Sequence, residues 1–175
     1  VAEEGPPGPE GNSVRLFHRR LHEPASQPLP GTDHPWNLAF SPDGAWLAFT
    51  SRLDHKLKKI ALGGGGAVEL ADLPWLGGTP DKAYWSESGR ILVADPAGPV
   101  RSYPASGGEA DVVVPREALE ADEQGTATPI PTTTPGRTLF AANGRQAIVV
   151  WADGKRQTLP LKGAGRPRRF GSYLL

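Results

Sequence analysis

The chain contains no cysteine, no long apolar run and no excess of either charge. Without cysteine it can form neither a disulfide nor a metal site with thiolate ligands. Its apolar runs are far shorter than a bilayer-spanning segment requires, so we expect no direct membrane contact. Nineteen basic residues balance nineteen acidic ones, which argues against general electrostatic binding to nucleic acid. We therefore predict no nucleic-acid partner.

Turn-forming residues are abundant instead. The 175 residues include 22 glycines and 19 prolines, scattered among short apolar runs. This composition is typical of short strands joined by tight turns and disfavours long helices. The sequence therefore predicts an all-β protein, with one helical stretch at residues 115–125, where proline lies in the first turn and glycine at the end.

One motif occurs twice, and the second copy begins about 45 residues after the first. The copies are NLAFSPDGAWLAF at residues 37–49 and KAYWSESGRILVA at residues 82–94. Each places an aromatic residue, a serine and a glycine in the same register between two apolar runs. A unit that repeats every ~40 to 50 residues is typical of a β-propeller blade, which must stack on its neighbours to bury its apolar faces.

The strand pattern divides the chain into a linker and a propeller region. Residues 1–13 are polar and rich in proline and glycine, which predicts a flexible linker, and the propeller is expected to cover residues 14–175. We predict about three whole blades of four strands each and two half blades. The whole blades are expected at approximately residues 36–71, 82–114 and 128–161, and the half blades at residues 14–30 and 166–175.

Two arrangements of the half blades are consistent with the sequence. Either they combine into one closing blade, or the chain is a propeller fragment with two open ends. Unpaired edge strands readily pair with another chain, so the second arrangement predicts self-association.

Two kinds of turn are expected between the strands. Ser41-Pro42-Asp43-Gly44 has the residue order of a type I turn. Asn143-Gly144 and Asp153-Gly154 are hairpin dipeptides, because they supply the positive φ angles that a two-residue turn requires.

The Ser41-Pro-Asp-Gly44 turn, with an aromatic strand before it and an apolar strand after it, resembles the TolB-like, WD-related β-propeller repeat. The wider order of segments is similar to the propeller that follows the kinase domain in many bacterial receptor-like Ser/Thr kinases. The segments that carry this likeness are residues 15–21, 27–31, 56–60, 104–109 and 154–159.

The likeness extends over residues 14–175, with departures in the later blades. The second copy of the turn reads Ser86-Glu-Ser-Gly89 and the third reduces to Thr134-Pro-Gly-Arg137. The resemblance implies a sensor or interaction domain with an extracytoplasmic or periplasmic location. It supplies no catalytic residues.

The sequence contains no pattern that identifies a catalytic or metal-binding site. The sequence has no Gly-x-Ser-x-Gly elbow and no Ser, His and Asp pattern that identifies a triad. His18 and His22 are spaced four apart, but on a strand and its exit their side chains would not converge on one ion. We therefore predict a protein that is not an enzyme, with no catalytic residues, no metal and no cofactor.

The loops offer a better candidate site. In a propeller, the loops between strands two and three and the loops that join blades lie on one face, where ligands and partners dock. We predict that a protein or small-molecule ligand binds there. The predicted binding residues are Arg52, Asp54, His55, Asp72, Trp75, Asp81 and Asp95. An alternative for Trp75 is that it fills a gap between blades.

The sequence thus predicts a non-catalytic recognition module, by resemblance the sensor part of a bacterial receptor-like kinase. One alternative is an accessory propeller that gates substrate to a serine hydrolase domain. Another is a structural fragment that completes a ring by self-assembly.

Overall fold

The computed structural model describes residues 2–4, 14–74, 83–95, 99–119, 127–130, 137–142, 147–160, 169–170 and 173–174. Every strand pairing among these residues is antiparallel. None of them belongs to a helix long and apolar enough to cross a membrane.

Three four-stranded sheets form the body of the molecule, and we name them blades I, II and III. Blade I consists of β4 (Pro35–Phe40), β5 (Trp46–Ser51), β6 (Lys56–Ala61) and β7 (Val68–Asp72). Blade II consists of β8 (Ala83–Trp85), β9 (Arg90–Ala94), β10 (Val100–Pro104) and β11 (Asp111–Val114). Blade III consists of β12 (Ala127–Ile130), β13 (Arg137–Ala142), β14 (Ala147–Ala152) and β15 (Lys155–Pro160).

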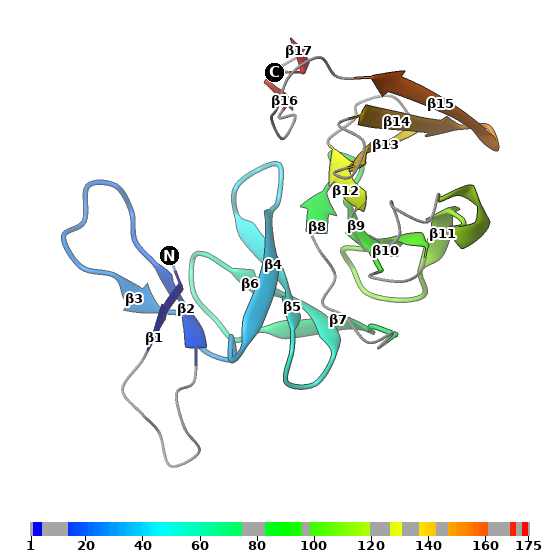
Figure 1. The fold of residues 1–175 in the computed structure, drawn as a ribbon. Helices are drawn as coiled ribbons and strands as arrows, with labels where there is room; N and C mark the ends of the chain where they lie inside the picture. Colours follow the sequence, from blue (N-terminus) through cyan, green and yellow to red (C-terminus); the bar gives the residue numbers. More distant parts are fainter. Residues whose placement is uncertain are drawn as a thin grey trace.

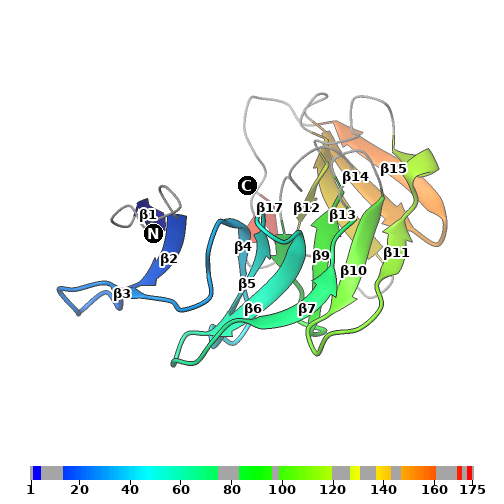
Figure 2. The ribbon, with the colours of Figure 1, turned by 90° about the horizontal axis from the view of Figure 1, so that it is seen from below.

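The blades follow one another along an arc, with β4, β8 and β12 on its inner side and β7, β11 and β15 on its outer side (Figure 1). Figure 2 shows the same blades stacked face to face. In each blade the strands lie in sequence order from the inside outward, because each is joined to the next by a hairpin. This arrangement confirms the predicted all-β fold as a propeller fragment.

Two smaller sheets lie at the ends of the arc. The first contains β1 (Ala2–Glu4), β2 (Val14–His18) and β3 (Gln27–Pro28), in that order. The prediction that residues 1–13 are all linker was wrong for Ala2–Glu4, which pair with β2; a free strand edge accepts such a segment because its backbone groups need partners. Residues 5–13 lie outside the described part of the chain.

The other end sheet contains only β16 (Arg169–Phe170) and β17 (Tyr173–Leu174). Among the described residues no strand pairing joins this hairpin to the sheet of β1, β2 and β3. The two half blades therefore form separate sheets, and the structure is an open fragment with one half blade at each end.

The expected helical stretch is described only as the 3₁₀ turn η1 (Arg116–Ala118). The prediction was wrong at both ends of this turn, because Pro115 precedes it and Leu119 follows it in extended conformations. Residues 120–126 lie outside the described residues.

The hydrophobic core lies between the sheets. Leu57, Trp85, Ile91 and Val93 belong to the cluster between blades I and II. A second cluster, which includes Leu16 and Phe49, joins β2 and Leu29, just after β3, to blade I. Strand β5 is buried along nearly its whole length because blade I has a neighbour on each face.

The hairpins between the first two strands of blades I and II are built alike. In blade I the amide of Gly44 donates to the carbonyl of Ser41 at 2.9 Å, and in blade II the amide of Gly89 donates to Ser86 at 3.1 Å. Both glycines have positive φ, 68° and 74°. In blade III, Asp153 and Gly154 have φ of 51° and 71°, the two consecutive positive angles of a type I′ turn. Asn143 and Gly144 lie outside the described residues.

Candidate functional site

Backbone hydrogen bonds bring three segments of blade I to one end of the sheet. The amide of Arg52 donates to the carbonyl of His34 at 3.0 Å, and the amide of Leu73 donates to the carbonyl of His55 at 2.8 Å. The start of β4, the loop after β5 and the segment after β7 are therefore neighbours. The loop after β9, which begins at Asp95, occupies the equivalent place in blade II. We call residues 34–36, 52–55, 72–74 and 95 together the loop face.

An aromatic side chain that the sequence analysis did not single out lies on this face. Trp36 is 43% exposed, and the guanidinium carbon of Arg52 lies 5.0 Å from the centre of its ring. This distance is typical of a cation–π contact. Trp36 lies at the start of β4, beside the loop after β5, and this position is the sequence signal that could have assigned it to the site.

Three residues near the Trp36–Arg52 contact have strained backbones. His34, Asn37 and His55 have φ of 48°, 49° and 56°, in the left-handed region that side chains other than glycine seldom occupy. Such strain persists only where surrounding contacts enforce it, and it often marks functional sites. Here the carbonyls of His34 and His55 accept the two hydrogen bonds that join the segments of the loop face.

A chain of charged side chains connects Asp54 to Asp72. Lys58 donates to Asp54 at 2.5 Å and lies 3.9 Å from Glu69. Lys56 donates to Glu69 at 2.6 Å and lies 3.7 Å from Asp72. Burial acts to raise the pKa of Asp54, but hydrogen bonds from Lys58 and Ser51 and the charge of Lys58 outweigh it, so the pKa is lowered. Asp54 is therefore ionised at neutral pH.

Asp95 has a different environment from the one we predicted. Its side chain is buried, with 1% of its surface exposed, and its Oδ2 accepts a 3.0 Å hydrogen bond from Nε of Arg101. Burial raises the pKa of Asp95, although the hydrogen bond and charge of Arg101 oppose the shift. Asp95 is thus almost fully buried, and its carboxylate is bonded to Arg101. Its predicted role in binding stays a prediction.

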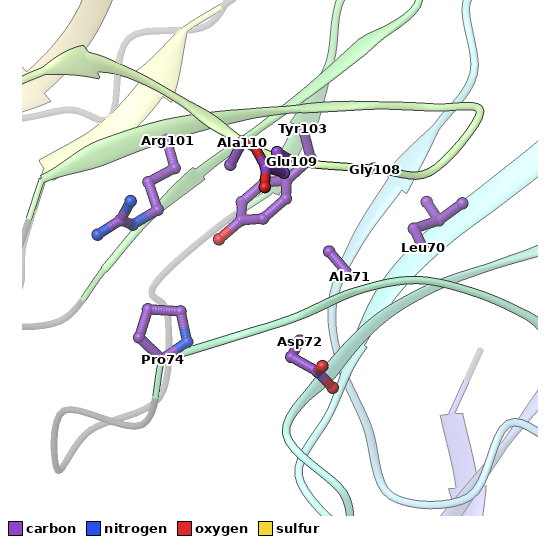
Figure 3. Close-up of a pocket in the computed structure, with 9 residues that line it drawn as sticks. All are labelled: Leu70, Ala71, Asp72, Pro74, Arg101, Tyr103, Gly108, Glu109 and Ala110. Carbon is purple, nitrogen blue, oxygen red and sulfur yellow. The ribbon is translucent and has the colours of Figure 1, made fainter.

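Arg101 lines a groove of about 640 Å³ between blades I and II. We call it the Tyr103 groove. Blade I contributes Leu70, Ala71, Asp72 and Pro74, and blade II contributes Arg101, Tyr103, Gly108, Glu109 and Ala110. The Tyr103 ring extends from β10 toward the segment that carries Ala71 and Pro74, whereas the carboxylate of Asp72 points away from it (Figure 3).

Tyr103 is neutral throughout the physiological range. Burial, reinforced by the negative charge of Asp95 and opposed by Arg101, raises the pKa of Tyr103 to about 12. Its hydroxyl therefore keeps its proton.

The volume of the groove falls within the ~300 to 1,000 Å³ usual for small-ligand sites.

Of the predicted site residues, Arg52, Asp54, His55 and Asp72 lie together on the loop face of blade I. Trp75 and Asp81 lie outside the described residues. Among the residues that the structure does describe, no group of three His, Asp or Glu side chains could hold a metal ion. The role of the predicted site residues in binding stays a prediction.

No protein-family model matches the sequence, and no curated protein matches it in a sequence search. Solved structures do match the fold. Virginiamycin B lyase from Staphylococcus aureus has a TM-score of 0.62 at 13% identity, over 95% of this chain and 57% of the lyase chain. A chain of the nidogen–laminin complex has a TM-score of 0.60 at 16% identity, over 89% of this chain and 60% of that one.

The WD40 β-propeller domain of Doa1 is also similar, with a TM-score of 0.54 at 13% identity over 96% of this chain and 53% of that one. The chain spans roughly half the length of the solved structures it matches. The matched structures include an enzyme and a chain from a protein–protein complex. At these identities the likeness shows the fold alone. The protein is a β-propeller fragment.

Proposed function

We propose that this propeller fragment is a non-catalytic recognition module that binds a protein partner through the loop face of blade I. The observation that carries the proposal is the contact between Trp36 and Arg52, in which a large aromatic ring is held 43% exposed beside a guanidinium. Tryptophan and arginine are the residue types most enriched at the energetic centres of protein interfaces.

The surroundings of this contact support a binding role. The strained segments at His34 and His55 are tied to their neighbours by backbone hydrogen bonds, so the site is held on a rigid scaffold. Asp54, paired with Lys58, supplies a negative charge on the same loop as Arg52. An exposed aromatic ring with charges of both signs at its rim is the usual composition of a protein-binding surface.

Site-specific photo-crosslinking in the native cells tests this proposal. A photoreactive amino acid at Leu53, which is 67% exposed on the loop face, should give one discrete crosslinked product. The matched control is Leu21, which is 98% exposed in the β2–β3 loop, outside the loop face, and it should give none. Equal crosslinking from both positions would contradict the loop-face site.

Two further variants connect the product to the Trp36–Arg52 contact. Trp36→Ala and Arg52→Ala should each reduce the crosslinked product from Leu53 by about tenfold or more, the effect of a hot-spot residue. The melting midpoint of each variant should stay close to that of the parent, since both side chains are partly exposed. Product that persists in both variants would place binding elsewhere.

We also propose, from the TolB-like resemblance, that the module is the sensor part of a bacterial receptor-like kinase. The coding sequence on either side of this chain tests that proposal. A kinase domain and a membrane helix upstream would support it, whereas a Gly-x-Ser-x-Gly domain downstream would support a propeller that gates a hydrolase. A solution mass of two or more times 18.6 kDa would support self-assembly.

The non-catalytic part of the proposal has its own test. Esterase, peptidase and phosphatase assays on the purified protein should remain at background. Turnover that disappears when a single Ser, His or Asp is replaced would show instead that the protein is an enzyme.

A further inference from the structure

The Tyr103 groove contains a cation that the loop-face proposal does not use. Arg101 reaches the groove from β10, and 28% of its side-chain surface is exposed. Its Nε donates to the buried carboxylate of Asp95. The two terminal nitrogens carry four more N–H donors, for which the described residues supply no protein acceptor.

Asp95 holds this guanidinium in a fixed position. Because Asp95 is almost fully buried, its hydrogen bond to Nε restricts the Arg101 side chain. A guanidinium whose Nε is already engaged presents its terminal N–H groups as a planar fork, which matches the two oxygens of a carboxylate. Groups that are ordered before binding lose less entropy when the ligand arrives.

The rest of the groove favours an apolar body beside that fork. Leu70, Ala71, Pro74 and Ala110 supply aliphatic surface, and the Tyr103 ring extends among them (Figure 3). The carboxylate of Asp72 points away from the ring, toward Lys56 on the neighbouring strand. The remaining acidic group is the exposed Glu109, at the end of the β10–β11 loop.

We propose that the Tyr103 groove binds a ligand that carries a carboxylate on an apolar body, with Arg101 as the anchor. This site goes beyond the proposed function, because its anchor Arg101 is not part of the loop face, although Asp72 and Pro74 border both surfaces. Two sources share the required chemistry: a free small carboxylic acid and the C-terminal carboxylate of a peptide.

Four matched probes distinguish a free carboxylic acid from a peptide C-terminus and test whether the carboxylate is required. N-acetyl-leucine and N-acetyl-leucinamide differ only in the carboxylate, as do acetyl-Ala-Ala-Ala-Leu with a free C-terminus and its amide. Each is titrated into the ¹⁵N-labelled protein, and the amide signals of Gly108 and Ala110 in the groove are followed. Gly44, in a distant hairpin, is the internal control.

The carboxylate of one or both pairs should give saturable shifts at Gly108 and Ala110, with an affinity at least about tenfold higher than that of its amide. Binding by only the free acid or only the peptide identifies the source, and binding by both shows that a carboxylate beside an apolar side chain is sufficient. If acid and amide bind equally, or if none of the four probes shifts these signals, the proposal is wrong.

Variants then test the role of Arg101. Arg101→Lys keeps the charge but loses the fork, so it should weaken carboxylate binding by about fivefold or more. Glu109→Gln removes the nearby negative charge and should strengthen binding by about twofold. Glu117→Gln, an exposed carboxylate on η1 that does not line the groove, is the matched control and should have no effect.

A further variant, Ala110→Leu, tests the groove if Arg101→Lys fails to fold. Ala110→Leu narrows the groove without changing the ion pair and should abolish the shifts at Gly108 while preserving the melting midpoint. Unchanged binding in a folded Ala110→Leu variant would contradict the groove site. None of these substitutions should alter crosslinking from Leu53, so failure here is distinguishable from failure of the loop-face proposal.

Discussion

Blades I and II each hold an aspartate in the loop after their second strand, and each pairs it with a base on the third strand. In blade I the pair is Asp54 and Lys58, whereas in blade II it is Asp95 and Arg101. Yet the pKa of Asp54 is lowered and the pKa of Asp95 is raised. The same loop in successive blades thus produces opposite electrostatic outcomes.

Burial explains the difference. The Asp54 side chain is 32% exposed, so hydrogen bonds and a nearby cation outweigh its desolvation. The Asp95 side chain is 1% exposed, and one arginine does not fully compensate for the loss of water. An ion pair alone therefore does not reveal whether a carboxylate is stabilised; its depth in the fold decides.

The largest expected effect comes from breaking the buried pair. Arg101→Met leaves the carboxylate of Asp95 buried without its partner and should lower the free energy of unfolding by about 3 kcal/mol. Lys58→Met, the matched change in blade I, breaks a more exposed pair and should cost about 1 kcal/mol or less. Urea unfolding at pH 7 measures both, and equal losses would remove the distinction between the blades.

The hairpin glycines provide a comparison in which the two blades should agree. A Cβ added at Gly44 or Gly89 would meet nothing within 4 Å, but both residues have positive φ. Gly44→Val and Gly89→Val should therefore each cost about 2 kcal/mol from backbone strain alone. Gly63→Ala is the control, because Gly63 has equal space and no positive φ, and it should be nearly neutral. A large difference between the two valine variants would show that the hairpins are not equivalent.

The pH dependence of stability should separate the two aspartates by sign. The raised pKa of Asp95 means that its contribution is fully present below its ordinary value of 3.8 and is lost as the pH rises through the folded-state pKa. The lowered pKa of Asp54 means that its contribution is present above 3.8 and is lost as the pH falls through the folded-state pKa.

The variants Asp95→Asn and Asp54→Asn reveal these opposite dependences of folding stability on pH. From pH 3 to pH 7, the stability of the parent relative to Asp95→Asn should fall, whereas its stability relative to Asp54→Asn should rise. Urea titrations at unit pH steps measure both. Slopes of the same sign would refute the burial argument.

The smallest expected effects concern two cation–π contacts at opposite ends of blade I. Lys59 lies 4.6 Å from the ring centre of Trp46 and also donates to the carbonyl of Ala105 in blade II at 2.8 Å, so Lys59→Met should cost about 1 kcal/mol. Arg52→Met removes the contact with the exposed Trp36 and should cost about 0.5 kcal/mol.

Crosslinking should distinguish the two cation–π contacts more clearly than the free energy of unfolding does. Arg52→Met should reduce crosslinking from Leu53, and Lys59→Met should leave it unchanged. The opposite result would move the binding surface to the other end of the blade.

Much of the local structure could be predicted from sequence. The Ser41 to Gly44 and Ser86 to Gly89 motifs each predict a hairpin, because serine and glycine satisfy local requirements of a turn. Asp153-Gly154 likewise predicts its type I′ turn. The strand pairing of Ala2–Glu4 with β2 was missed, because a polar, proline-rich context masked a segment whose partner is supplied by another part of the chain.

The candidate site was predicted only in outline. Loop position placed Arg52, Asp54, His55 and Asp72 at one end of blade I, since alternating strands return the chain to the same end. Sequence could not show that Asp95 is buried, that Trp36 is exposed or that Arg101 and Tyr103 share a groove with Ala71. Each of these depends on how closely two blades approach.

The sequence by itself therefore determined the repeat, the strands, the hairpins and the order of blades, because alternation and turn chemistry act within a few residues. Only the tertiary structure decided the different environments of Asp54 and Asp95, the exposed contact of Trp36 with Arg52, and the groove beside Tyr103. The physical reason is that burial is a property of neighbouring sheets, and it sets the strength of each charge and the accessibility of each ring.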